Sequence, residues 1–457
     1  MEALQRLHNR GSISTGYDID NSCKFEEDNS EYLERATGGG NGSTTKHTIS
    51  VWVKRTEITK TSFILGFANI GRLRFESDDK IEYQFRSGRK IETNRLFRDT
   101  SAWYHIVVVA DSSLATSTDR MKLYVNGVRE TDLLTYVAQD QNQGSPAWGV
   151  YNTYNYRIGY SGSSGDNFNG YIADAYYING QTLDPTDFGE TDEDSGIWKP
   201  KAFTGTFGSL DNYLDFSNSS NLGEDANGGT DLSSNNITSA DQATDTPTNN
   251  FCTWNPLWNY ASYPTISEGA TKVRIDDSTD EGAKASIGLT NGKWYWEAKP
   301  VGTIGSQYIG IQTDGDSNIY SNANSLLNNY TMVINTTGRY YSYSGSLSES
   351  SAGQFTNFTT SQWLGIALDM DSGTQTIKYY KDGSLILTLD LISTMQGQTV
   401  FPFLVNYENR SWDINFGGYT INTISSAASD ADGYGTFEYA PPSGYYALCT
   451  KNLEEYG

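Results

Sequence analysis

One unit occurs twice in this sequence and restricts the folds open to the chain. A tryptophan opens an alternating strand, an aspartate ends it, and a second strand with a central tyrosine leads to Asn-Gly or Asp-Gly. The copies run from Trp103 to Gly127 and from Trp363 to Gly383. Asn-Gly and Asp-Gly supply the positive φ of a tight turn, so each copy predicts a β-hairpin. Trp and Gly lie 24 residues apart in the first copy and 20 in the second, which the loop between the strands can absorb. The repeat predicts two sandwiches of related architecture.

The rest of the chain also favours β structure. Tyrosine (32) and tryptophan (10) suit half-buried strands, and the 45 glycines suit turns. Helix-forming stretches are hard to find. Short alternating runs such as Thr48–Val53 and Tyr171–Ile178 recur between Gly, Asn, Asp and Ser clusters. At 457 residues the chain exceeds one ordinary domain, so we predict an all-β protein of two sandwiches.

Changes in composition indicate the boundaries between domains. We predict an N-terminal arm over residues 1–18, a sandwich over 19–200, a polar linker over 201–250, a second sandwich over 251–420 and a C-terminal segment over 421–457. The linker is rich in Ser, Asn, Asp and Gly and has too little apolar surface to fold alone. Because it contains the apolar run YLDF, we expect it to pack on the sandwiches.

Several phrases resemble known families. FRDT (97–100) and Gly170–Glu190, with the first hairpin, resemble a laminin-G-like domain, especially the version found in structural proteins of tailed phages of marine bacteria. GKWYWE (292–297) and WDINFG (412–417), with the second hairpin, resemble a SPRY domain. The resemblance implies two concanavalin-A-like antiparallel sandwiches (jelly rolls) joined by an irregular linker.

The closing phrase PSGYYALCTKNL (442–453) resembles the ending of the same phage proteins. The resemblance therefore implies a component of the virion surface, in the tail or on the capsid, that assembles in the host cytoplasm. Its implied partners are other virion proteins and a homo-oligomer, with a trimer as one option. A long attachment module is absent, so the short arm or a face of a sandwich is expected to anchor the protein.

Charge and cysteine content exclude several classes of protein. The 55 acidic residues outnumber the 32 basic ones, and the net charge of −23 repels phosphate backbones and anionic membranes. We therefore expect neither nucleic-acid binding nor membrane insertion. Cys23, Cys252 and Cys449 form neither a disulfide framework nor a metal-knuckle spacing. No run approaches the roughly 18 apolar residues of a membrane helix, and no secretory signal opens the chain.

Catalytic patterns are not found. His105 lies inside an alternating strand without a signalled Cys or Ser–Asp partner, so we interpret it as a packed residue. A glycosidase would need two carboxyl groups about 5 Å apart. The best candidates, Glu76 to Glu82 and Glu190 to Asp194, do not match the acid–apolar–acid pattern of catalytic strands and look like solvated turns. We predict that the protein is not an enzyme.

Calcium is the one ligand ion left open, with no other cofactor expected. Laminin-G-like domains often hold Ca²⁺ at a rim through carboxylates and carbonyls. The acidic turns that could contribute are Asp111, Asp119 and Asp174, and in the second sandwich Asp314 and Asp316.

Binding is the function that remains. Two aromatic, polar stretches, 148–156 and 340–343, are poorly patterned for a core, and we interpret them as recognition loops. The candidate residues are Trp148, Tyr151, Tyr154, Tyr156, Tyr340, Tyr341 and Tyr343. Strand packing or subunit contact is the competing interpretation. We predict a tail fibre or receptor-binding appendage that recognises host-surface glycan or protein. The alternatives are a capsid-decorating or tail-cementing protein and, behind it, a glycan depolymerase.

Overall fold

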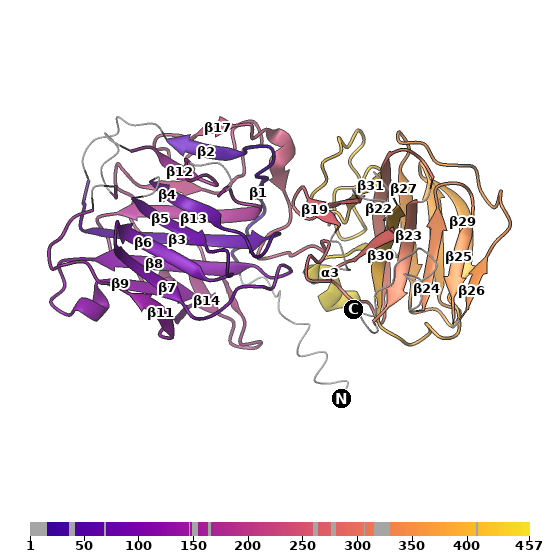
Figure 1. Cartoon of the computed structure of the whole chain (residues 1–457), viewed down its shortest axis with the longest axis horizontal. Coiled ribbons are helices and arrows are strands. Elements are labelled where there is room, and N and C mark those ends of the chain that lie inside the picture. The colour runs from indigo at the N-terminus through magenta and orange to yellow at the C-terminus, as the bar shows by residue number, and fades with distance from the viewer. Residues whose placement is uncertain are drawn as a thin grey trace. The chain divides into compact units, whose positions relative to one another are not determined.

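The computed structural model confirms an all-β chain of antiparallel sandwiches (Figure 1). It describes residues 16–35, 42–67, 70–145, 147–148, 154–162, 166–258, 264–275, 280–305, 307–314, 330–344, 346–407 and 410–457. One compact unit spans Ile13–Thr248, and a second contains Asn249–Gly457. The segment predicted as a linker therefore belongs to the first unit up to Thr248. Most of the predicted arm, residues 1–15, lies outside the described residues.

Two sheets face each other in the first unit. The sheet that contains the recurring hairpin, here called the hairpin sheet, has the order β10-β9-β8-β3-β13-β1-β18, with β16 also paired to β13. Its strands are β1 (Ser22–Phe25), β3 (Lys46–Arg55), β8 (Tyr104–Asp111), β9 (Met121–Val125), β10 (Val128–Arg129), β13 (Gly170–Asn179), β16 (Asn212–Leu214) and β18 (Gln242–Ala243).

The facing sheet of the first unit has the order β11-β7-β6-β5-β4-β12-β2-β17. Its strands are β2 (Tyr32–Arg35), β4 (Ser62–Phe67), β5 (Gly71–Phe75), β6 (Ile81–Arg86), β7 (Arg89–Thr93), β11 (Leu133–Tyr136), β12 (Tyr156–Ile158) and β17 (Ser233–Asn235). A small ribbon of β14 (Gly189–Thr191) and β15 (Trp198–Pro200) and the 3₁₀ turns η1 (Ser117–Asp119), η2 (Pro185–Asp187) and η3 (Ser239–Asp241) complete the unit.

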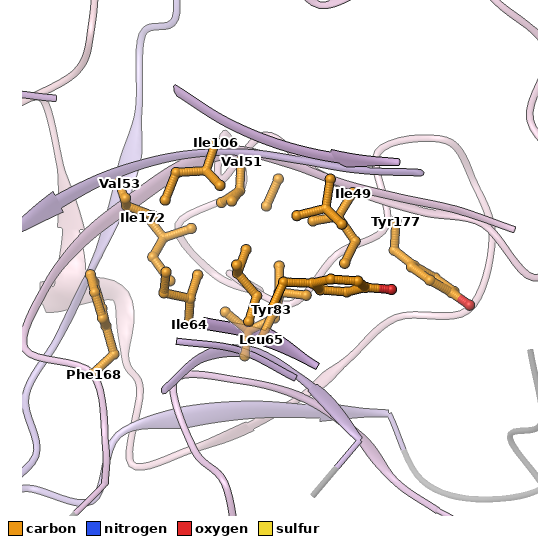
Figure 2. Packing of buried hydrophobic residues seen from close by; sticks show 14 of the residues in the cluster. Ile49, Val51, Val53, Ile64, Leu65, Tyr83, Ile106, Phe168, Ile172 and Tyr177 are labelled. Atoms are coloured by element: carbon orange, nitrogen blue, oxygen red, sulfur yellow. The ribbon is translucent and has the colours of Figure 1, made fainter. Parts of the chain in front are cut away.

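The core of the first unit lies between these sheets. Figure 2 shows Ile49, Val51 and Val53 of β3 directed toward Ile64 and Leu65 of β4. All five side chains are fully buried. Because side chains alternate along a strand, the residues between them on β3 must face the opposite side of the sheet. Ser50, Trp52 and Lys54 are nevertheless buried as well, so something covers the outer face.

The cover is the chain after β13. Trp198 of β15 stacks on His105, and Tyr213 stacks on Tyr176 with ring centroids 4.2 Å apart. Asp245, in the segment predicted as a linker, accepts hydrogen bonds from Lys54 Nζ at 2.7 Å and from Trp103 Nε1 at 3.0 Å. Six apolar residues of the segment are also buried in the core of the unit: Leu210, Leu214, Phe216, Leu222, Leu232 and Ile237. Polar composition hid this role, because these residues are spread among polar ones rather than gathered in one strand-length run.

The second unit repeats the plan. Its hairpin sheet has the order β19-β20-β31-β22-β27-β28-β29, with β32 paired to β22, and its facing sheet has the order β21-β30-β23-β24-β25-β26. The strands of the hairpin sheet are β19 (Thr265–Ser267), β20 (Lys272–Ile275), β22 (Lys293–Gly302), β27 (Leu364–Asp369), β28 (Thr376–Lys381), β29 (Ser384–Asp390), β31 (Arg410–Asn415) and β32 (Tyr446–Ala447). Those of the facing sheet are β21 (Asp280–Lys284), β23 (Gln307–Thr313), β24 (Thr331–Asn335), β25 (Tyr340–Tyr343), β26 (Leu347–Glu349) and β30 (Val400–Tyr407).

The C-terminal segment, which ends in helix α3 (Thr450–Tyr456), covers the second hairpin sheet. Glu297 of β22 is fully buried and accepts the backbone N–H groups of Glu438 and Tyr439, both at 2.8 Å. It also accepts hydrogen bonds from Tyr295 and Asn415. Burial raises the pKa of Glu297 to about 7, against these hydrogen bonds. In both units, therefore, a buried carboxylate joins the hairpin sheet to the segment that covers it.

The two hairpins pair two residues out of register with each other. Val107, four residues after Trp103, lies opposite Tyr124, whereas Gly365, two residues after Trp363, lies opposite Tyr380. A shift of two leaves every side chain on its original face because strands alternate with a period of two. Contrary to the prediction, the loop alone therefore does not absorb the length difference, because the paired strands are also shifted by two residues, which does not turn the hairpin over.

The turn glycines have a second role. Gly127 and Gly383 have φ of 76° and 75°, as the Asn-Gly and Asp-Gly pairs predicted. A Cβ at Gly127 would lie 2.5 Å from the ring of Trp198, and one at Gly383 would lie 2.7 Å from the ring of Tyr439. Each glycine therefore leaves room for an aromatic ring of the covering segment.

We expect Asp245→Ala to destabilise the first unit by about 3–5 kcal/mol, because it removes the carboxylate that pairs with the buried ammonium of Lys54. The side chains of Lys54 and Asp245 are 0% and 2% exposed. Denaturant unfolding of the purified chain measures the effect. The control Asp194→Ala, at an exposed turn, should stay near wild type. The double variant Lys54→Met with Asp245→Leu should lose less than the single one, and a loss that is no smaller would contradict the ion-pair explanation.

Candidate functional site

His105 is a packed residue, in agreement with the sequence interpretation. It is fully buried, and its ring lies between Trp52 and Trp198. Trp198 Nε1 donates to Nδ1 at 2.9 Å, so Nε2 carries the ring proton and donates to Ser50 Oγ at 2.8 Å. Burial lowers the pKa of His105 to about 3. A neutral imidazole with both nitrogens occupied has no capacity for acid–base chemistry.

Asp174, a predicted metal ligand, lies in a cluster of phenols. Its Oδ1 accepts hydrogen bonds from Tyr17, Tyr176 and Tyr213 at 2.9, 3.1 and 2.9 Å. The residue has a φ of 47° at a register shift of β13, which turns the carboxyl toward the covering segment. Burial raises the pKa of Asp174 to about 6 despite the three donors. The carboxyl therefore holds the covering segment and Tyr17 in place.

The other predicted calcium ligands have protein partners. Asp111 pairs with Lys46 at 3.0 Å and accepts the N–H of Ser113, while Asp119 lies 3.6 Å from Arg129. Asp369 repeats this arrangement in the second unit, where it pairs with Lys293 at 3.0 Å and accepts the N–H of Ser372. Asp111 is therefore a structural residue of the turn, as Asp369 is in the second unit.

Asp111, Asp119 and Asp174 are not brought together. Asp314 is exposed, and Asp316 lies outside the described residues. Among the residues that the structure describes, no group of three or more His, Cys, Asp or Glu side chains could hold a metal ion. No described helix is long and apolar enough to cross a membrane.

The first group of candidate glycosidase acids lies on the outer face of the first facing sheet. Glu82 is buried and is held by Arg72 at 2.9 Å, Arg74 at 3.2 Å and Lys90 at 2.8 Å. Burial alone would raise the pKa of Glu82, but these cations hold it below its usual value, whereas burial raises the pKa of Glu76. Both oxygens of Glu82 are engaged, which disfavours it as a nucleophile.

The remaining candidate acids are also paired or lie in turns. Asp79 is buried between Arg55 at 3.1 Å and Arg98 at 2.8 Å, and Asp78 pairs with Lys80. Glu190 and Asp192 both approach Lys199, at 3.6 and 2.9 Å. Glu193 and Asp194 lie in the turn that follows.

The first predicted recognition loop contributes to the core instead. Trp148 and Tyr156 are 0% and 1% exposed, so their rings cannot lie against a ligand. Trp148 stacks on His47 with ring centroids 4.4 Å apart, and Tyr156 begins β12. Tyr154 is partly buried against the same core, and Tyr151 lies outside the described residues. The prediction is wrong for Trp148 and Tyr156, because large aromatic rings fill the end of a wide sandwich as readily as they line a binding site.

The second predicted loop is strand β25, and its tyrosines face both ways. Tyr340 packs on the sandwich core, whereas Tyr341 and Tyr343 belong to a separate cluster on the opposite side of the sheet. Alternation explains the division, since neighbours on a strand point to opposite faces. Two of the three predicted residues thus share one surface.

We call this surface the aromatic face of the second unit. It combines buried Val333, Phe403 and Val405 with partly exposed Trp258, Tyr308, Tyr341 and Tyr343. The rings of Tyr308 and Tyr341 meet edge to face at 5.2 Å and 77°, and those of Trp258 and Phe403 at 5.8 Å and 88°. Sequence reasoning missed Tyr308 and Trp258. The phrase QYIGIQT carried a signal for Tyr308, because its isoleucines alternate with residues that must face outward.

A buried lysine lies at the margin of the aromatic face. Lys284 is 2% exposed, donates to Thr313 O at 3.0 Å and has its ammonium 4.5 Å from the ring centroid of Trp258. Burial lowers its pKa to about 8, against the charge of Asp314. The contact is a cation–π interaction that holds Trp258 over the sheet.

Comparison with known proteins agrees with the fold. Residues 27–186 match the family model of the concanavalin A-like lectin/glucanases superfamily, so the first unit contains a concanavalin A-like domain. No curated protein matches the chain.

Solved structures with similarity to this chain include the SPRY domain of human HERC1 (13% identity, TM-score 0.28, 37% of this chain and 99% of that one). A SAP-like pentraxin from Limulus polyphemus has 17% identity and a TM-score of 0.28 over 37% of this chain and 80% of that one. The carbohydrate binding module CBM66 from Bacillus subtilis has 12% identity and a TM-score of 0.25 over 37% and 92%. Likeness at this level carries no argument about function.

The raised pKa of Asp174 predicts a pH dependence of stability. The folded state holds the proton more strongly than the unfolded chain, whose aspartate titrates near 3.8. The stabilising contribution is therefore complete below about pH 4 and is lost as pH rises through about 6, with a size of about 3 kcal/mol. Unfolding of the wild type and of Asp174→Asn at several pH values tests this. The free energy of unfolding of the wild type, relative to that of Asp174→Asn, should fall as pH rises through about 6. A difference that does not change with pH would rule out titration of Asp174.

Chelation should have little effect on this protein. Because Asp111, Asp119 and Asp174 already have partners, we expect the thermal midpoint to stay the same in EDTA and in millimolar Ca²⁺. A metal bound only by the native state would raise the midpoint with concentration. A Ca²⁺-dependent rise in calorimetry would contradict the assignment of these residues to structural roles.

Proposed function

We propose that this protein is a non-enzymatic attachment protein of a virus particle, a tail fibre or receptor-binding appendage that recognises glycan or protein on the host surface. The aromatic face of the second unit carries the proposal. Rings that remain partly exposed on a rigid sheet are a common basis of recognition, because they offer contact area at a low entropic cost.

Two further observations support the proposal. The first unit contains a concanavalin A-like domain, and the matching family model is that of the concanavalin A-like lectin/glucanases superfamily. The phrases FRDT and Gly170–Glu190 resemble those of phage structural proteins, which gives the virion surface as the proposed location and other virion proteins as partners.

The engaged carboxylates of the first unit favour binding over catalysis. Glu82 has a cation at both oxygens, and Asp79 lies between two arginines. A retaining glycosidase needs one carboxylate free to attack and a second to donate a proton. The described candidate acids of this chain do not supply that pair.

Purified protein is expected to bind host cells and to leave their polysaccharide intact. Binding of labelled protein to cells, with a reducing-sugar assay on the supernatant, measures both. Release of reducing sugar would show an enzyme. Labelling the protein in assembled particles for electron microscopy gives its position. Tight association with isolated capsid or tail proteins, without any binding to cells, would favour the decorating or cementing role instead.

A further inference from the structure

The aromatic face also indicates the chemistry of its ligand. We propose that it binds an uncharged glycan, whose sugar rings lie against Tyr308, Tyr341 and Tyr343. This inference rests on the proposed attachment function and adds to it a location and a ligand class. The binding surface is then a sheet face of the second unit, rather than the loops that the sequence indicated.

The geometry of the rings suits a chain of sugars. Tyr341 and Tyr343 are two residues apart on β25, which places them about 7 Å apart along the strand. Tyr308 meets Tyr341 edge to face from β23, two strands away, and Val333 of β24 lies buried between those strands. The rings therefore have firm support, and each keeps part of its surface in solvent. Apolar ring faces on a rigid sheet can pack against the C–H faces of sugars.

Polar groups at the edge of the rings can bind sugar hydroxyls. The hydroxyl of Tyr341 accepts from Asn335 Nδ2 at 3.3 Å and donates to Glu349 Oε1 at 3.1 Å. Glu349 also pairs with Arg339, and the side chains of these two residues are 43% and 37% exposed. This group offers both donors and acceptors, and sugar hydroxyls need both. Its internal hydrogen bonds hold Tyr341 in one orientation before the ligand arrives.

Charge favours an uncharged ligand. Among the described residues of this face, the charge of Arg339 is balanced by Glu349, and Lys284 is buried beside Trp258, so neither presents an uncompensated, exposed positive charge to a uronic acid. The whole chain carries a net charge of −23, which repels anionic polymers at the distance of a Debye length, about 8–10 Å. A protein partner is the other outcome of the test, because rings bordered by an ion pair also occur at protein interfaces.

Direct binding of full-length protein to host polysaccharide tests the proposal. The envelope polysaccharide of the host is separated by anion exchange into neutral and acidic fractions, and each is immobilised. We expect retention on the neutral fraction. Tyr341→Ala should weaken binding by about tenfold through loss of the ring contact, and Tyr341→Phe should weaken it less, because the ring remains. The control Tyr32→Ala removes a partly exposed tyrosine from the first unit and should bind as wild type. Unchanged thermal midpoints confirm that each variant is folded.

Three results would overturn the inference. They are retention on the acidic fraction alone, unaltered binding by Tyr341→Ala, and loss of cell binding when host cells are treated with protease, which would indicate a protein receptor. In each of these cases wild-type protein can still bind cells, so the attachment function stands. Conversely, retention on the neutral fraction without any binding to intact cells would support the aromatic face and contradict the attachment function.

Discussion

The structure depends on burial of the outer face of each hairpin sheet beneath the unit's own chain. Both faces of the central strands of such a sheet are buried, so a charge on their outer face needs a partner there. In the first unit, Asp245 supplies one for Lys54 and also accepts from Trp103. In the second unit, Glu297 accepts N–H groups of the covering segment, and no cation pairs with it among the described residues. Each carboxylate therefore contributes to holding the covering segment on its sheet.

The recurring hairpin has the same turn in both units. Gly127 and Gly383 allow the turn, and the missing Cβ makes room for Trp198 in one unit and Tyr439 in the other. An alanine at either position would therefore strain the backbone and displace a ring of the cover. In both units an aromatic ring of the covering segment lies against the glycine of the same turn. The hairpin is scaffold, and the covering segment packs against its turn glycine.

With one sheet covered, the facing sheets become the surfaces that carry the differences between the units. The first presents ion pairs around Glu82, and the second presents partly exposed rings around Tyr341. Paired charges on a sheet face are costly to desolvate for a partner, whereas supported rings are not. This physical contrast, more than the family resemblance, is why recognition is proposed for the second unit.

The sequence by itself determined the β character, the two hairpins, the positive φ of their turn glycines and the packed state of His105. These follow from periodicity, turn chemistry and residue type, which act over a few neighbouring residues. Only the tertiary structure decided that Trp148 and Tyr156 belong to the core and that the polar segment with Asp245 completes a sandwich. It also decided that Tyr340 packs on the core while Tyr341 lies on the aromatic face. The period of two divides a strand into two faces but does not say which face is covered. That choice depends on partners such as Lys54 and Asp245, which lie far apart in the chain and meet only when it folds.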